Sequence, residues 1–288
     1  MIPGGMIPGE IMKKGIRRVE FFPREWGLER CFSAAADAGF EGMELIFRAD
    51  TGKVDSSIRS STEGLPPGYH PWQSLAASVT FDTDAKKCSE IRVSAEAYGV
   101  RISSLATGYS LLGAPDSREF EKTKHYLEGA VIRTKWLGGT HVLISFEKTP
   151  PDTPDETARQ WAVELLRRVV PTAEKEGITL AYELVWPAIY STPDEVLRIL
   201  EQVGSENLGC YFDPANIIEN FAPSHETADG SEGSGSKTAG RTGAQILPEA
   251  ARPDVWLSRL GQYAAAVHIK DYSEIGRASC RERVCHRV

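Results

Sequence analysis

The chain has 288 residues and a formal net charge of −7, and 41% of its residues are hydrophobic. This length allows one large α/β barrel or two smaller domains, and the composition is that of a globular protein with a sizeable core. The acidic balance disfavours nucleic-acid binding, and the sequence shows neither an apolar run of roughly 20 residues nor the apolar centre of a signal peptide. We therefore expect a cytoplasmic protein with a small-molecule partner and no nucleic-acid or membrane partner, and a homo-oligomer stays open.

Short β-branched runs alternate along the chain with longer amphipathic runs, which predicts βα units and a parallel sheet. Glycines that follow several of the amphipathic runs are typical of helix ends. Seven strands are predicted, at 16–22, 42–47, 101–106, 141–146, 179–183, 209–213 and 265–269. Six helices are predicted between them, at 28–38, 85–98, 118–137, 155–176, 193–203 and about 253–263.

Three segments do not read as barrel sequence. Residues 1–14 are expected to form a disordered N-terminal extension. Residues 222–253 are rich in Gly, Ser and Thr, which predicts a flexible insertion that is either a tolerated surface loop or an active-site lid. Residues 276–288 carry four arginines without apolar periodicity and resemble a translated sequencing adapter, so we expect a non-native tail in place of the natural C-terminus.

The seven predicted strands fit either a doubly wound sheet or an eightfold barrel that lacks one unit. Neither the glycine-rich dinucleotide fingerprint nor the P-loop pattern occurs in the sequence, which disfavours the open sheet. We therefore predict a TIM (β/α)8-type barrel over residues 15–275, C-terminally truncated, with strand 8 and the last helix missing.

Metal-ligating residue types stand at three consecutive predicted strand ends. Glu183 ends the fifth strand, Asp213 the sixth, and His268 lies near the end of the seventh. The carboxyl ends of barrel strands converge on one mouth, and a Mn, Mg, Co or Zn ion would offset the cost of burying these groups together. The alternative for each residue is a structural role, as a helix cap or as a satisfied buried group.

Four short motifs carry a resemblance to a known family. They are AGFEGMEL at 38–45, AYEL at 181–184, NLGCYFDPAN at 207–216 and VHIKD at 267–271. In this order and spacing they resemble the xylose-isomerase-like TIM barrels, and within them the sugar-phosphate isomerases/epimerases, over about residues 15–271.

The resemblance implies that Glu183, Asp213 and His268 are three of four metal ligands and that Glu183 is also one of two acid/base carboxylates. The fourth ligand, a Glu at the end of strand eight, has no counterpart here. Asn216 stands where the family often has a substrate-contacting His, and Lys270 is implied to bind a substrate oxygen, with an exposed loop lysine as the alternative.

The implied reaction is metal-dependent isomerisation or epimerisation of a small sugar or keto-sugar, phosphorylated or not, through an enediolate. With one acid/base carboxylate missing, weak metal binding and little or no turnover are expected. An inosose-type dehydratase and a non-catalytic sugar- or partner-binding barrel stay open. An endonuclease IV-like repair enzyme is disfavoured, because it needs a His-rich trinuclear zinc site and DNA binding by an acidic chain.

Several other polar or aromatic residues are weaker candidates. Glu44, Glu147 and His141 lie in or just after predicted strands, where a salt-bridged or supporting role is favoured over catalysis. His70 and Trp72 could cover a bound sugar, although loop packing explains them equally. His225 and His286 are given no ligand role, because they lie in the insertion and in the suspect tail.

Overall fold

The computed structural model describes residues 13–18, 22–23, 26–49, 79–108, 110–184, 189–221, 248–269 and the backbone of 283–286. The strands are β1 (Lys13–Arg17), β2 (Gly42–Arg48), β3 (Val79–Thr80), β4 (Arg101–Thr107), β5 (Ser110–Leu112), β6 (His141–Ile144), β7 (Phe146–Lys148), β8 (Thr179–Glu183), β9 (Leu208–Phe212), β10 (Ala264–Ile269) and β11 (Arg283–His286). The helices are α2 (Leu28–Asp37), α3 (Ala85–Ala97), α4 (Arg118–Leu137), α5 (Asp155–Glu176), α6 (Pro193–Val203), α7 (Pro214–Phe221) and α8 (Pro253–Leu260), with short 3-10 helices η3 (Glu249–Ala251) and η4 (Gly261–Tyr263).

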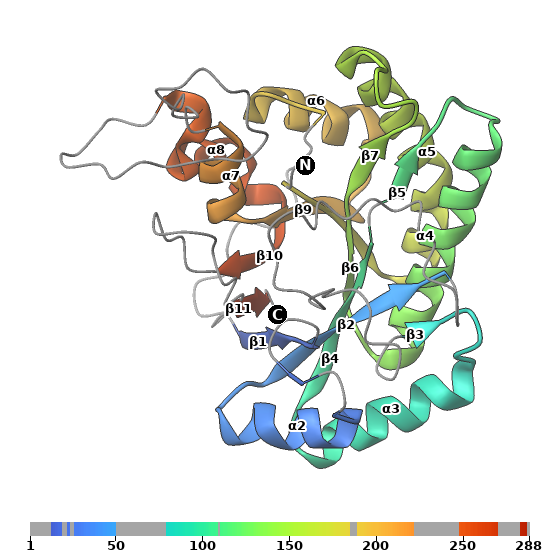
Figure 1. The fold of residues 1–288 in the computed structure, drawn as a ribbon, viewed down its shortest axis with the longest axis vertical. Helices are drawn as coiled ribbons and strands as arrows, with labels where there is room; N and C mark the ends of the chain where they lie inside the picture. Colours follow the sequence, from blue (N-terminus) through green and yellow to red (C-terminus); the bar gives the residue numbers. More distant parts are fainter. Residues whose placement is uncertain are drawn as a thin grey trace, which may run out of the picture.

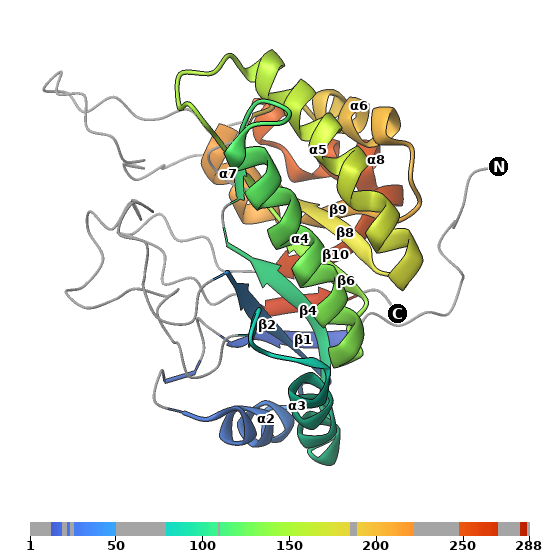
Figure 2. The ribbon, with the colours of Figure 1, turned by 90° about the vertical axis from the view of Figure 1, so that its right-hand side faces the viewer.

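The main sheet closes into a barrel (Figure 1). Seven strands are parallel neighbours, in the order β1, β2, β4, β6, β8, β9 and β10. The antiparallel β11 pairs with both β10 and β1 and so closes the ring. Helices α4 and α5 lie side by side on the outside of the sheet (Figure 2). The predicted TIM-barrel fold class is thus confirmed.

The place of an eighth parallel strand in the ring is taken by β11, which runs in the opposite direction. Its residues belong to segment 276–288, whose non-native origin stays a prediction. Among the described residues, the ring holds seven parallel strands, one for each strand that the sequence pattern predicts.

The first predicted strand, at 16–22, is wrong in its position. β1 begins at Lys13 and ends at Arg17, so it takes in two residues that were assigned to the N-terminal extension. Arg18 directly follows β1, and its guanidinium donates hydrogen bonds to the carbonyl oxygens of Phe22, Pro23 and Trp26. Phe22 is buried as expected, but it lies outside the strand.

The helices follow their local signals closely. α4, α5 and α6 have the predicted bounds, and Gly138 and Gly177 end α4 and α5 in the left-handed conformation. Thr192 and Glu195 form a reciprocal capping box at the start of α6. The sequence pattern did not predict α7, whose eight residues directly follow Asp213.

Two apolar layers hold the barrel together. The larger core fills the space between the helices and the outer face of the sheet. A small cluster fills the barrel interior: Ile46, Ala106, Leu143, Ala181, Tyr211 and Ala266. Because side chains alternate along a strand, residues two positions from this cluster also face inward, and several of them are polar.

Three cysteines have described side chains, namely Cys31, Cys88 and Cys210, and all are buried free thiols. Burial raises the pKa of Cys88 to about 11 and that of Cys210 to about 12, which makes both unreactive at neutral pH. None of the helices in the described part of the chain has both the length and the apolar character needed to cross a membrane.

Candidate metal centre

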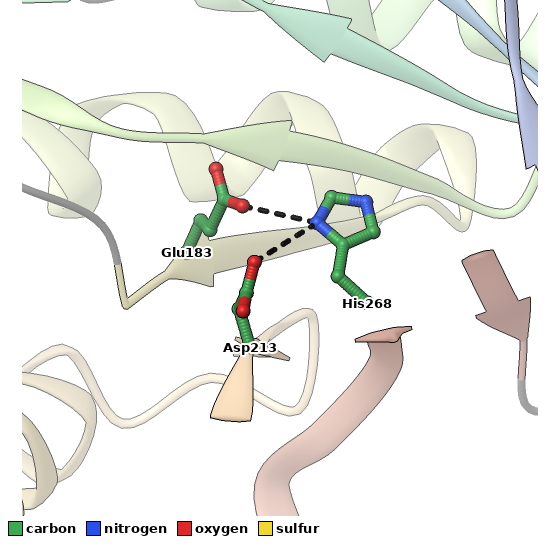
Figure 3. A group of neighbouring side chains, drawn as sticks. All are labelled: Glu183, Asp213 and His268. Atoms are coloured by element: carbon green, nitrogen blue, oxygen red, sulfur yellow. Dashed lines mark hydrogen bonds and ion pairs between the residues drawn. The ribbon is translucent and has the colours of Figure 1, made fainter. Parts of the chain in front are cut away.

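Glu183, Asp213 and His268 meet at one end of the barrel interior (Figure 3). The Nδ1 atom of His268 lies 3.0 Å from Oε1 of Glu183 and 3.9 Å from Oδ2 of Asp213. One ligand atom from each residue falls within 4.8 Å of the others, and all three residues are buried. The structure therefore brings together the three side chains that the sequence singled out.

Strand alternation places these residues. Glu183 is two positions after Ala181, Asp213 two after Tyr211 and His268 two after Ala266, and all three earlier residues belong to the interior apolar cluster. The polar group therefore lies directly against this cluster.

The donor set suits a divalent cation. Two ligands that share an ion at roughly 2.0–2.5 Å cannot be more than about 5 Å apart, a limit that this group respects. Two carboxylates and an imidazole are ligands that Mn, Co, Zn and, through oxygen, Mg accept. Their ligand role stays a prediction, because the same contacts also satisfy buried polar groups.

Asp213 has a structural role as well. Its Oδ1 accepts a hydrogen bond of 2.9 Å from the backbone N–H of Asn216, which makes Asp213 the N-terminal cap of α7. Its other carboxylate oxygen, Oδ2, is the atom that faces His268. The structural role that was the alternative for Asp213 is therefore present, and its role as a metal ligand stays a prediction.

Two substitutions of Asp213 are expected to separate cap from ligand. Asn is as good a cap as Asp, so Asp213→Asn should keep the cap, whereas Asp213→Ala should be less stable than the Asn variant by about 1 kcal/mol. Both should weaken Mn²⁺ binding by at least about 100-fold, since loss of a direct ligand costs more than loss of its hydrogen-bond partner. Calorimetric Mn²⁺ titration and urea unfolding measure the two effects, and wild-type affinity in the Asn variant would leave Asp213 a cap only.

The remaining predicted site residues fall in different places. Asn216 is buried in the first turn of α7, three residues after Asp213. Lys270, His70, Trp72 and His225 lie outside the described residues. Glu147 and His286 belong to β7 and β11 by their backbones only, and the four residues of β11 carry no carboxylate.

Glu44 is fully buried and contacts charged groups from two other strands. Oε1 lies 3.1 Å from Nε of Arg17 and 3.6 Å from Nε2 of His268. Oε2 accepts hydrogen bonds from the hydroxyls of Ser104, at 2.7 Å, and Tyr211, at 2.9 Å. Burial alone would raise the pKa of this carboxyl, but hydrogen bonding to His268, the charge of Arg17 and the Ser104 hydroxyl outweigh it and lower the pKa to about 2.

The salt-bridged role expected for Glu44 agrees with these contacts, but its partners were missed. Tyr211 could have been found from the sequence, because it stands two residues before Asp213 on the same face of a strand. Arg17 and Ser104 gave no such signal, since they lie on β1 and β4 without a neighbouring candidate.

His141 is a second buried histidine of the barrel interior, and its Nδ1 lies 3.0 Å from Oγ1 of Thr140. Burial lowers its pKa from 6.5 to about 4, with Glu44 opposing and His268 reinforcing the change. The ring is therefore neutral at pH 7, which fits the supporting role expected for it.

This lowered pKa predicts acid sensitivity. Between pH 6.5 and 4 the unfolded chain binds a proton at His141 that the folded chain does not, so stability falls as the pH falls, by about 3 kcal/mol across the window. Replacing His141 with Gln removes this contribution. We expect the free energy of unfolding in urea to favour the wild type most at pH 7 and least at pH 4, and a pH-independent difference would contradict the assignment.

Comparisons with known proteins agree with the barrel fold. The family model described as "Xylose isomerase-like TIM barrel" matches residues 32–287. A curated relative, the C-glycoside deglycosidase alpha subunit of Arthrobacter globiformis, is 28% identical over 220 residues, which are 73% of this chain and 54% of that protein. The chain thus spans about half the length of this relative.

Two solved structures show the same fold. A xylose isomerase-like TIM barrel protein from Mycobacterium smegmatis in complex with magnesium has a TM-score of 0.58 at 16% identity, covering 91% of this chain and 76% of the other. D-psicose 3-epimerase in the presence of D-fructose has a TM-score of 0.54 at 15% identity, covering 72% of this chain and 65% of the other. The family match extends over most of the barrel, and we conclude that the chain belongs to the xylose isomerase-like TIM barrel family.

Proposed function

We propose that this protein is a divalent-metal-dependent enzyme that isomerises or epimerises a small sugar or keto-sugar through an enediolate. The observation that carries the proposal is the buried group of Glu183, Asp213 and His268, whose ligand atoms lie within 4.8 Å of one another. The family membership and the magnesium-bound structural neighbour support it.

In this proposal Glu183, Asp213 and His268 hold the metal. A bound Mn, Mg, Co or Zn ion would polarise the substrate carbonyl and stabilise the negative charge that develops on it. Glu183 is the group that removes the proton from the carbon next to the carbonyl, with two electrons of the C–H bond moving into the enediolate. Return of this proton from Glu183 to the neighbouring carbon gives isomerisation. Epimerisation needs a proton delivered to the opposite face of the same carbon by a donor other than Glu183, such as a water molecule.

Substrate binding is assigned to Asn216 and Lys270. Asn216 is near the group, because its backbone N–H is bonded to Asp213, and its side-chain amide can both donate to and accept from a sugar hydroxyl. Lys270 follows β10, two residues after His268, where a cationic side chain would favour an anionic oxygen or a phosphate.

The same proton removal also suits an elimination. If the carbon on the far side of the deprotonated carbon carries a leaving group, its loss gives an unsaturated ketone instead of reprotonation. A hydroxyl leaving as water makes the enzyme an inosose-type dehydratase. An aglycone leaving from a keto-glycoside makes it a C-glycoside-cleaving enzyme, and the match to the Arthrobacter globiformis alpha subunit favours testing this second candidate.

One experiment compares the candidates. The protein, loaded with Mn²⁺, Co²⁺, Mg²⁺ or Zn²⁺ in turn, is incubated in D₂O with keto-hexoses, keto-pentoses, inososes and keto-C-glycosides. The proposal predicts metal-dependent deuterium incorporation or epimer formation with a keto-sugar, whereas loss of water or of an aglycone would select an elimination. Activity that is unchanged by a chelator and in His268→Ala would refute a metal-dependent reaction.

A further inference from the structure

The two ring nitrogens of His268 face different carboxylates. Nδ1 points at Glu183 and Asp213, and Figure 3 shows the other ring nitrogen directed away from both. That nitrogen, Nε2, lies 3.6 Å from Oε1 of Glu44. One imidazole therefore connects the candidate metal centre to a carboxylate that lies outside it.

Glu44 is itself held firmly in place. Its carboxylate forms an ion pair with Arg17 and accepts hydrogen bonds from the hydroxyls of Ser104 and Tyr211, at distances between 2.7 and 3.1 Å. The side chain is fully buried, as is that of Tyr211. A carboxylate with this many fixed donors keeps its orientation, and a metal-binding histidine needs such a fixed acceptor beside its second ring nitrogen.

Tyr211 completes the arrangement. Its ring lies against the imidazole of His268, with ring centroids 4.1 Å apart, while its hydroxyl donates to Glu44. The face of the imidazole and its Nε2 edge are thus contacted by two side chains that also contact each other. Rotation of the ring about its bond to Cβ would break both contacts.

We infer that Glu44 is the positioning residue of the candidate metal centre: its Oε1 faces Nε2 of His268 at 3.6 Å and favours the tautomer with the proton on Nε2, so that Nδ1, which lies 3.0 Å from Glu183 in this structure, would be free to bind the ion. This inference rests on the proposed function, because it assigns Glu44 a task only if His268 binds a metal. Glu44 does not touch the ion or the substrate in this arrangement, and Arg17, Ser104 and Tyr211 act through it.

The test replaces Glu44 with Gln, which has the same size and no charge. A Gln amide can turn its NH₂ toward Nε2, which favours the tautomer with the proton on Nδ1 and so opposes metal binding. Zn²⁺ and Mn²⁺ affinities, measured by calorimetry well below the unfolding temperature, are expected to fall about 10- to 100-fold. The matched control is Glu128→Gln, which removes a carboxylate from the surface pair with Lys124 and should leave the affinity unchanged.

Two further readouts separate positioning from stability. In the zinc-loaded wild type, ¹⁵N spectra assigned with a His268→Gln variant should show a protonated Nε2 whose hydrogen exchanges slowly, and Glu44→Gln should lose this protection. Tyr211→Phe keeps the ring against His268 and removes one hydrogen bond to Glu44, so we expect a smaller loss of affinity in a variant that keeps its core packing. If Glu44→Gln fails to fold, this second variant decides the outcome.

The outcomes distinguish the inference from the function on which it rests. If the wild type and His268→Ala bind Zn²⁺ and Mn²⁺ equally, the proposed metal centre is refuted and the inference with it. If the wild type binds through His268 while Glu44→Gln and Tyr211→Phe retain full affinity and an unchanged ¹⁵N signature, only the inference is overturned.

Discussion

Replacing Glu183 with Gln is expected to lower kcat by a further ~10²- to 10⁴-fold from the low turnover expected of a chain with one acid/base carboxylate, because this is the range for loss of a positioned general base. Gln is isosteric with Glu but cannot accept the carbon-bound proton, and its neutral oxygen is a weaker ligand than a carboxylate. The side chain is buried and its Oε1 lies 3.0 Å from Nδ1 of His268, so removing the charge also alters the group that we propose to hold the ion. Both losses act on the same reaction, which makes this the largest effect expected on activity.

The measurement follows deuterium exchange and product formation at several Mn²⁺ concentrations. Raising the metal until activity no longer increases separates weak binding from loss of the base, because only the first is restored by excess metal. Glu164→Gln, which changes a half-buried partner of Arg168 on the helix α5, serves as the control and should retain wild-type kcat. Full recovery of Glu183→Gln at saturating metal would show that Glu183 is a ligand without an acid/base role.

Replacing Gly209 with Ala is expected to destabilise the fold by about 3 kcal/mol, the upper range for overpacking a dense interior. A Cβ at this position would lie 2.5 Å from the carbonyl oxygen of Tyr263 and 3.7 Å from Cβ of Ala265. The obstacle is the backbone of η4, which leads directly into β10, so relief requires η4 and the start of β10 to move away from β9. Since β10 carries His268 and β9 leads to Asp213, the same movement should also weaken metal binding.

Urea unfolding of the metal-free protein measures the stability change. The control is Gly108→Ala, because a Cβ at Gly108 would have no atom within 4 Å, and we expect its effect to stay within about 0.5 kcal/mol, as for other substitutions in open space. A Gly209→Ala variant as stable as the control would mean that the two strands are not as close as the structure shows.

Local signals determined most of the secondary structure. The bounds of α4, α5 and α6 follow from caps and glycine ends that act over a few residues, and the strand between them, Thr179–Glu183, follows from alternation and branching. The first strand was misplaced because the β-branched and aromatic residues between Ile16 and Phe22 resemble a strand, whereas in the structure β1 ends at Arg17 and Arg18 donates hydrogen bonds to the carbonyl oxygens of Phe22 and Trp26. α7 was missed because its start depends on Asp213, which had already been assigned to a strand end.

The candidate site was predictable in part, because its three residues stand at the ends of predicted strands. Parallel strands of a barrel converge at their carboxyl ends, so Glu183, Asp213 and His268 could be grouped from their places on three neighbouring strands. A helix cap was the alternative role for Asp213. The structure shows that Oδ1 caps α7 while Oδ2 faces His268.

The sequence by itself determined most of the helices and strands and the polar side chains at three strand ends, because periodicity, caps and turns act between near neighbours. Only the tertiary structure decided that Glu44 contacts Arg17, Ser104 and Tyr211. It also decided that Glu44 faces Nε2 of His268, the ring nitrogen that points away from Glu183 and Asp213. These partners come from different strands, up to 167 positions apart between Glu44 and Tyr211. Their meeting depends on the stagger and closure of the whole barrel, and no local pattern encodes those two properties.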